Sequence, residues 1–150
     1  MHESLDTAIL LVEDDTGHAR LIEKNLRRSG LNNDIVKFNN GKKVIDYLFP
    51  DTPPPSQMNK SAMLMLLDLN MPVMDGVQVL EKIKSERQTK NMPIIVLTTT
   101  DDPREVEKCY ELGCNVFIRK PVDYEKFSQA IKQLGLLINV MSTPEIPTDD

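Results

Sequence analysis

The sequence predicts an α/β fold, in which a single doubly wound domain is built around a central parallel sheet of five strands. Short apolar runs alternate with amphipathic segments along the 150 residues, without internal repeats, and this order favours βα units. Several runs are continuously apolar, which is typical of strands buried on both faces. The chain is long enough for one domain with a sizeable core.

The five predicted strands are short, and four of them are followed by a residue that could belong to one site. We assign them to Ala8–Val12, Ile35–Phe38, Met63–Leu67, residues 94–97 and Val116–Arg119. The residues directly after the first, third, fourth and fifth strands are Glu13, Asp68, Thr98 and Lys120. Ligands of open parallel sheets bind outside the carboxyl ends of the strands, so these four side chains are candidates for one site.

The five predicted helices alternate with the strands. We assign them to residues 16–29, 41–49, 77–87, 102–113 and 123–140. Gly30 and Gly113 stand where the first and fourth helices end, a position at which glycine is favoured. The fourth helix also has start signals, because Asp102 can cap it, Pro103 fits its first position and Glu105 completes a capping box.

Two segments lie outside this plan. Residues 50–62 form a long connection with three successive prolines, and residues 142–150 form a polar tail that we expect to be disordered. We therefore assign the domain to residues 1–141. The chain ends shortly after its last predicted helix, so we expect no DNA-binding output domain.

Composition narrows the classes of function. The formal net charge of -5 argues against a nucleic-acid surface, which needs basic patches. No apolar stretch could span a membrane and no signal peptide is visible, so we expect a cytoplasmic protein without a membrane partner. Cys109 and Cys114 match no metal-binding spacing and are expected to be reduced and packed. We expect His18 to be a solvated helix residue rather than a modulator of the site.

The first and third strand ends predict a metal site. Glu13, Asp14 and Asp68 are expected to lie close together, where like charges repel and raise one another's pKa unless a cation joins them. Mg²⁺ suits this set because it takes one or two carboxylates, a carbonyl and several waters. The alternative, in which residues 13–15 only cap the first helix, leaves Asp68 without a partner.

The fourth and fifth strand ends predict phosphoryl chemistry. Lys120 brings a positive charge and Thr98 a hydroxyl donor. A divalent ion, an ammonium and a hydroxyl around one carboxylate suit a phosphoryl group in transfer, because catalysis there is mostly positioning and charge neutralisation. Asp68 would attack phosphorus and carry an acyl phosphate. An ordinary solvated lysine is the alternative for Lys120.

These motifs resemble the receiver domain of the two-component response regulators. The resemblance rests on residues 9–15, 66–72, 74–76, 96–99 and 118–121, in this order, and covers residues 7–141. It implies a flavodoxin-like sheet of strand order 2-1-3-4-5 and phosphorylation of Asp68 by a sensor histidine kinase. It further implies Mg²⁺ bound by Asp14, Asp68 and the Asn70 carbonyl, with Glu13 acting partly through water, and phosphoryl oxygens held by Thr98 and Lys120.

The same resemblance implies a conformational switch. Phe117 falls where the family has its switch aromatic, so phosphate would draw Thr98 inward and the vacated space would admit the ring. The movement would bias the surface of the fourth helix and fifth strand. Phe117 lacks the hydroxyl of a tyrosine at this position, and a plain core phenylalanine is the alternative.

A finer resemblance is to the stand-alone regulators paired with bacterial, notably cyanobacterial, phytochromes. It rests on the long connection before Met63, the run at residues 68–72, residues 109–114 and the ending near Met141. It implies a phytochrome as the kinase and a homodimer formed through the fourth helix, fifth strand and fifth helix. Residues 136–138 (Leu-Leu-Ile) add apolar surface that suits such an interface, with core packing as the alternative.

We therefore expect a single-domain phosphoacceptor, not an enzyme in the ordinary sense, that loses its phosphoryl group slowly and signals by changing partners or dimerising. A phosphorelay shuttle is one alternative. A haloacid-dehalogenase-type phosphatase needs a second acid two residues after the nucleophile, where this chain has Asn70. A nucleotide binder needs a phosphate loop after the first strand, where three acidic residues stand instead.

Overall fold

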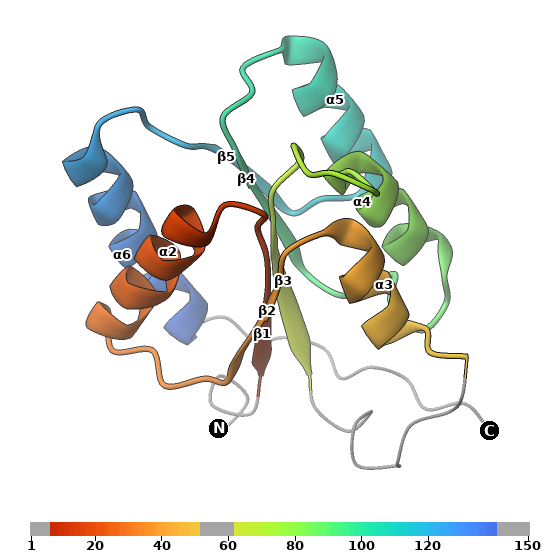
Figure 1. Ribbon diagram of the computed structural model, residues 1–150, viewed down its shortest axis with the longest axis horizontal. Coiled ribbons are helices and arrows are strands. Elements are labelled where there is room, and N and C mark those ends of the chain that lie inside the picture. The colour runs from red at the N-terminus through yellow and green to blue at the C-terminus, as the bar shows by residue number, and fades with distance from the viewer. Residues whose placement is uncertain (1–6, 52–61, 141–150) are drawn as a thin grey trace.

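A five-stranded parallel sheet with helices on both faces forms the fold (Figure 1). The computed structural model describes residues 7–51 and 62–140, and within them every predicted strand and helix is present. The elements are β1 (Ala8–Val12), α2 (Thr16–Arg28), β2 (Ile35–Phe38), α3 (Gly41–Leu48), β3 (Met63–Leu67), α4 (Gly76–Ser85), β4 (Ile94–Thr98), α5 (Pro103–Leu112), β5 (Val116–Arg119) and α6 (Tyr124–Val140). The predicted tail and residues 52–61 of the predicted connection lie outside the described residues.

The strand order is β2-β1-β3-β4-β5, which confirms the doubly wound, flavodoxin-like fold. The register brings the strand ends to one level: Val12 of β1 pairs with both Phe38 of β2 and Leu67 of β3. Because Glu13 and Asp68 come directly after this paired level, they leave the sheet side by side. The topology thus delivers the predicted site residues to one edge.

The core has two layers, one on each face of the sheet. Alternate residues of a strand point to opposite faces, so Leu10 and Val12 pack with α3, α4 and α5, while Ile9 and Leu11 pack with α2 and α6. Figure 1 shows α2 and α6 on one side of the sheet and α3, α4 and α5 on the other. No helix of the described segments is both long and apolar enough to traverse a lipid bilayer.

The capping of α5 differs from the prediction in one respect. Asp102 caps α5 by accepting a hydrogen bond from the Arg104 amide at 3.0 Å, but no capping box forms there. The Glu105 carboxylate instead accepts from the Thr100 hydroxyl at 3.2 Å, because that donor lies in the preceding loop. A complete capping box occurs at α4, between Asp75 and Gln78.

The loop between β3 and α4 carries the strand-end carboxylate and is tightly packed. A Cβ at Gly76 would collide with the Asp68 carbonyl oxygen, so only glycine allows this close approach of helix and strand end. Val73, in the same loop, has a φ of 70°, and the Met74 amide donates to the Pro72 carbonyl at 2.8 Å. A left-handed β-branched residue is strained, so this loop holds a costly backbone conformation.

The structure confirms the packed cysteines that the sequence predicts. Cys109 and Cys114 are buried free thiols, and burial raises the pKa of Cys109 to about 11, as suits packed, unreactive sulfur.

On α6, Ile138 is buried in the core, while Leu136 and Leu137 are exposed. The apolar excess predicted for this helix therefore consists of the two leucines.

Candidate functional site

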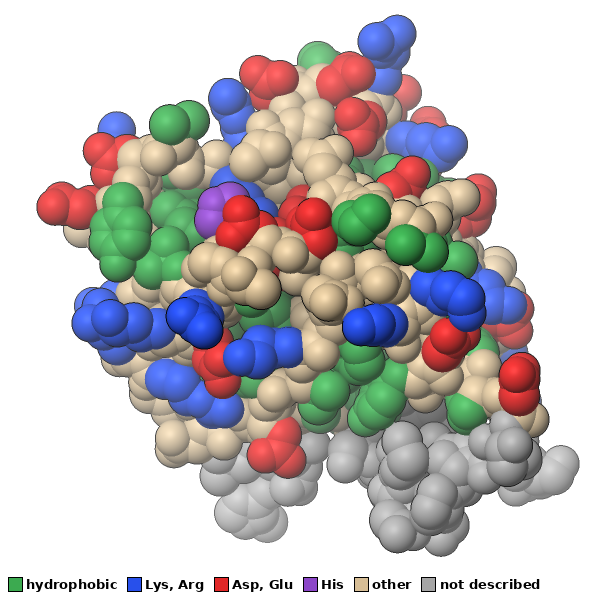
Figure 2. All heavy atoms as spheres, in the orientation of Figure 1, with side chains coloured by type: hydrophobic (Ala, Val, Ile, Leu, Met, Phe, Trp, Pro, Cys, Tyr) green, Lys and Arg blue, Asp and Glu red, His purple; other side chains and the backbone are tan. Residues whose placement is uncertain are grey.

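The predicted site residues meet at the carboxyl edge of the sheet. Glu13, Asp68, Thr98 and Lys120 are buried there, and Asp14 is exposed beside them. Backbone hydrogen bonds fix two of these positions, because the Glu13 amide donates to the Phe38 carbonyl and the Asp68 amide to the Val12 carbonyl, both at 3.0 Å. Figure 2 shows carboxylates gathered next to a histidine on this part of the surface.

Three carboxylates form a cluster that suits a hard cation. One oxygen from each of Glu13, Asp14 and Asp68 lies within 4.8 Å of the other two. Such an arrangement is electrostatically unfavourable on its own, and oxygen ligands of this kind are those that divalent cations such as Mg²⁺ prefer. The residues present therefore fit the predicted metal.

The Lys120 ammonium lies next to two of these carboxylates and partly compensates their negative charge. Its Nζ lies 2.5 Å from Glu13 Oε1 and 3.5 Å from Asp68 Oδ2. The Lys120 amide donates to the Thr98 carbonyl at 2.7 Å, which ties the strand end to β4. The solvated-lysine alternative is wrong, since the side chain is buried among carboxylates. An ammonium in this position can neutralise charge that develops on an Asp68 oxygen or on a group bound to it.

Burial dominates the protonation of Glu13. It raises the pKa of the Glu13 carboxyl to about 7, with a smaller contribution from the Asp68 charge, although the hydrogen bond and charge of Lys120 act in the opposite direction. A divalent ion needs the carboxylate form of its ligand. Metal binding through Glu13 therefore competes with protonation near neutral pH.

Asn70 connects the carboxylate cluster to the hydroxyl. Its amide N–H donates to Asp68 Oδ1 at 3.2 Å, and its side-chain Nδ2 donates to Thr98 Oγ1 at 3.3 Å. The chain thus brings Asp68, Asn70 and Thr98 into one hydrogen-bonded set. Thr98 Oγ1 accepts from this neutral amide, and its own O–H can donate to a charged acceptor.

Phe117 lies on the neighbouring strand, on the face shared with Thr98. It pairs with Val96, two residues before Thr98 on β4, so all three side chains point to the same side of the sheet. Its ring is half-buried against the core beneath α3, α4 and α5. The Phe117 amide donates to the Tyr110 hydroxyl of α5 at 3.1 Å, which joins β5 to that helix.

Sequence reasoning missed one member of the site. His18 is partly buried, with Nδ1 3.3 Å from Lys120 Nζ and its ring centroid 5.9 Å from that of Phe127 on α6. The expected solvated histidine is therefore wrong. Its position three residues after the cap Asp15 was visible in the sequence, but its proximity to a lysine 102 residues away depends on the fold.

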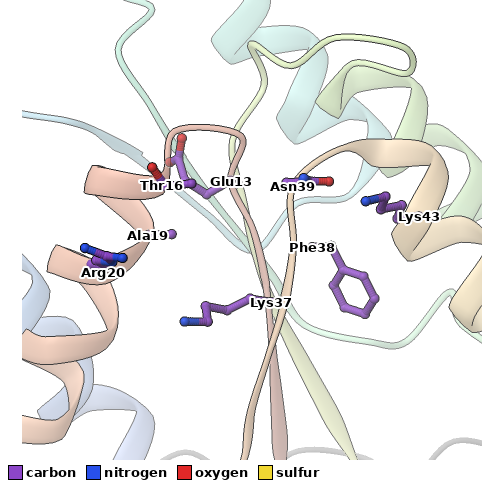
Figure 3. A pocket seen from close by; sticks show the side chains of 8 residues that line it. All are labelled: Glu13, Thr16, Ala19, Arg20, Lys37, Phe38, Asn39 and Lys43. Carbon is purple, nitrogen blue, oxygen red and sulfur yellow. The ribbon is translucent and has the colours of Figure 1, made fainter.

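A cavity of about 370 Å³ opens beside the cluster, between α2 and the edge strand β2. Its lining includes Glu13 and the cationic side chains of Arg20, Lys37 and Lys43 (Figure 3). Lys37 also pairs with Glu23 at 2.8 Å. In a chain of net charge -5, this local positive charge favours the approach of anions to the edge of the site.

The sheet order and the strand-end residues match a known family. The family model for the response regulator receiver domain matches residues 9–132. The chain belongs to this family. Receiver domains are signalling domains of two-component systems rather than enzymes of the ordinary kind.

Response regulators, one of them a cyanobacterial phytochrome response regulator, are among its relatives. Rcp1 of Synechocystis is 33% identical over 136 residues, which cover 85% of this chain and 88% of Rcp1. The solved Mn²⁺-bound form of Rcp1 has a TM-score of 0.79 with 28% identity and covers 91% and 98% of the two chains. The solved phosphorylated cyanobacterial phytochrome response regulator RcpA has a TM-score of 0.77 with 29% identity, over 94% and 98%.

A bacterial receiver domain is similar over nearly the whole chain. The solved domain from Rhodospirillum rubrum has a TM-score of 0.88 and 50% identity, and the match covers 94% of this chain and 99% of that one. This likeness agrees with the strand order and with the five βα units. The fold and family are therefore shown by sequence and structure together.

Proposed function

We propose that this chain is a single-domain response regulator whose Asp68 accepts a phosphoryl group from a sensor histidine kinase. The proposal rests on one observation: the buried Asp68 carboxylate has the Lys120 ammonium 3.5 Å from one oxygen and the Asn70 amide N–H at the other, at 3.2 Å. The Asn70 side chain in turn contacts the Thr98 hydroxyl at 3.3 Å. That RcpA has been solved in a phosphorylated form supports this assignment.

Mg²⁺ is the proposed cofactor. Glu13, Asp14 and Asp68 would hold it with the Asn70 carbonyl, Glu13 in part through water, and the Mn²⁺-bound Rcp1 supports a divalent ion in this type of site. When bound, the ion neutralises the carboxylates and the charge that spreads over the phosphoryl oxygens during transfer. The other steps of phosphoryl transfer are carried out by Asp68, Lys120 and Thr98.

In the proposed reaction, an Asp68 oxygen forms a bond to phosphorus while the bond from phosphorus to the imidazole nitrogen of the kinase breaks. The imidazole leaves with the electron pair of that bond. The Lys120 ammonium turns from Glu13 to a phosphoryl oxygen, and the Thr98 hydroxyl donates to a second phosphoryl oxygen. Asn70 offers no acid two residues after Asp68, so the acyl phosphate is hydrolysed slowly and lasts long enough to signal.

The proposed output is a change on the surface formed by α5, β5 and α6. When Thr98 turns to the phosphoryl group, Phe117 follows on the same face of the sheet, and the Tyr110 hydroxyl carries the movement of β5 to α5. The exposed Leu136 and Leu137 on α6 suit a homodimer or a protein partner. The proposed kinase is a bacterial phytochrome, in keeping with the phytochrome response regulator RcpA, and we propose neither a nucleic-acid nor a membrane partner.

Intact-mass measurement tests the phosphoacceptor. The protein, incubated with Mg²⁺ and a small phosphodonor, is expected to gain the mass of one phosphoryl group, and Asp68→Asn is expected to gain none. Asp46→Asn serves as a matched control, because Asp46 is an exposed helix carboxylate paired with Lys42. Equal uptake by Asp68→Asn and the unaltered protein would overturn the assignment.

Sedimentation tests the proposed output. With the phosphoryl mimic beryllofluoride and Mg²⁺, the protein is expected to sediment as a dimer at micromolar concentration. Leu136→Glu with Leu137→Glu is expected to remain monomeric under the same conditions, because charge replaces the exposed apolar surface. A monomer in the unaltered protein with and without beryllofluoride would exclude dimerisation as the output.

A further inference from the structure

Lys120 has three acceptors around its ammonium, and one of them does not belong to the carboxylate cluster. Glu13 Oε1 lies at 2.5 Å, His18 Nδ1 at 3.3 Å and Asp68 Oδ2 at 3.5 Å from Nζ. An ammonium has three N–H groups and no lone pair, so each contact can use one donor. Among these acceptors, His18 is the one that is not a carboxylate.

The contact with Lys120 restricts which ring nitrogen of His18 can carry a proton. Because Lys120 can only donate, Nδ1 of His18 must accept and carries no proton, which leaves the ring proton on Nε2. A proton on Nδ1 would place two donors 3.3 Å apart with no acceptor between them. A hydrogen bond from Lys120 to His18 therefore requires the tautomer in which Nε2 carries the ring proton.

The imidazole is held on two sides. The His18 amide donates to the Asp15 carboxylate at 2.9 Å in the cap of α2, which fixes the backbone. The ring lies against Phe127 of α6, with 5.9 Å between ring centroids and 59° between ring planes. Residues from two helices therefore aim Nδ1 at the lysine, and little conformational entropy remains to be lost when the hydrogen bond forms.

We infer that His18 is a positioning residue for Lys120, and this inference rests on the proposed phosphoacceptor function. A metal bound by Glu13 and Asp68 weakens the attraction of both carboxylates for the ammonium. The hydrogen bond to His18 does not depend on those carboxylates. It keeps one N–H of Lys120 occupied, so that the other two remain directed towards Asp68 and a phosphoryl group on it.

A set of substitutions at His18 tests this role through the phosphorylation rate. With Mg²⁺ and a small phosphodonor, His18→Leu is expected to lower the maximal rate of Asp68 phosphorylation about tenfold, as befits a lost hydrogen bond to a charged group. His18→Asn places an amide oxygen near the position of Nδ1 and is expected to restore most of the rate. Lys24→Leu, an exposed change on the same helix, is the matched control and should leave the rate unaltered.

A double-mutant cycle shows whether His18 acts through Lys120. In a Lys120→Ala background, His18→Leu is expected to change the rate less than about twofold, because the group that it positions is gone. Equal losses in the two backgrounds would overturn the inference. So would an unchanged rate in His18→Leu, or a rate in His18→Asn as low as that in His18→Leu.

A second readout separates this inference from the proposed function. The Lys120 ammonium signal in ¹⁵N-labelled, metal-free protein is expected to move or broaden in His18→Leu and to remain in His18→Asn and Lys24→Leu. An unmoved signal in His18→Leu overturns the positioning role whether or not Asp68 takes up phosphate. Absence of phosphate uptake in the unaltered protein, with the expected change in this signal, would overturn the proposed function alone.

Discussion

The central strand β3 and the edge strand β5 both deliver a residue to the site, but they are built differently. All five residues of β3 are buried, whereas none of the four residues of β5 is. The nucleophile candidate Asp68 therefore follows a strand that is packed on both faces, and Lys120 follows one that is partly open to solvent. Rigid packing suits a group that must keep its geometry, and partial exposure suits a strand that must shift.

Large-to-small substitutions in the two strands should reveal this contrast most strongly. Leu66→Ala in β3 removes a fully buried side chain and is expected to lower the free energy of unfolding by about 3 to 4 kcal/mol. Phe117→Ala in β5 removes a larger but half-buried ring and is expected to cost about 2 kcal/mol. Urea denaturation of both variants measures the difference. A greater loss in Phe117→Ala would reverse the assignment of the rigid strand.

Glu13, which follows β1 beside the central strand, should give the stability of the protein a pH dependence. The pKa of Glu13 is raised by burial from 4.5 to about 7, so the native state binds a proton more tightly than the unfolded chain. In metal-free protein, the contribution of Glu13 is therefore most favourable below pH 4.5 and declines as pH rises to about 7, by up to roughly 3 kcal/mol.

Glu13→Gln isolates this effect, because glutamine does not titrate. The difference in unfolding free energy between the unaltered protein and Glu13→Gln should change across this pH range and become constant above it. Mg²⁺ affinity should rise over the same interval, since the metal needs the carboxylate. A difference that does not vary between pH 4.5 and 7 would contradict the raised pKa.

The smallest expected effect lies in the loop that leaves β3. Val73 is 75% exposed and strained at φ 70°, so Val73→Gly is expected to stabilise the protein by about 1 kcal/mol. Val122→Gly is the control, because Val122 is 99% exposed and has no left-handed backbone. The midpoints of thermal unfolding of the two variants, each compared with the unaltered protein, measure this difference. Equal shifts would mean that the strain at Val73 contributes nothing measurable.

Much of the fold and part of the site could be predicted from the sequence. Continuous apolar runs indicated buried parallel strands, and the residues directly after Val12, Leu67 and Arg119 were candidates because parallel strand ends meet at one edge. His18 could not be found in this way, since its role depends on how α2 and α6 approach each other. The pairing of Glu105 with Thr100 could not be predicted for a different reason, because it depends on the conformation of the loop before α5.

The contact between Lys120 and Glu13 has a consequence for how the chain matures. Three carboxylates meet when the strands assemble, and Lys120 supplies a counter-charge from the chain itself. A newly synthesised molecule can therefore complete its sheet before it encounters any ion. The side chain that is proposed to meet phosphate thus also supplies the charge that lets these carboxylates share one edge of the sheet.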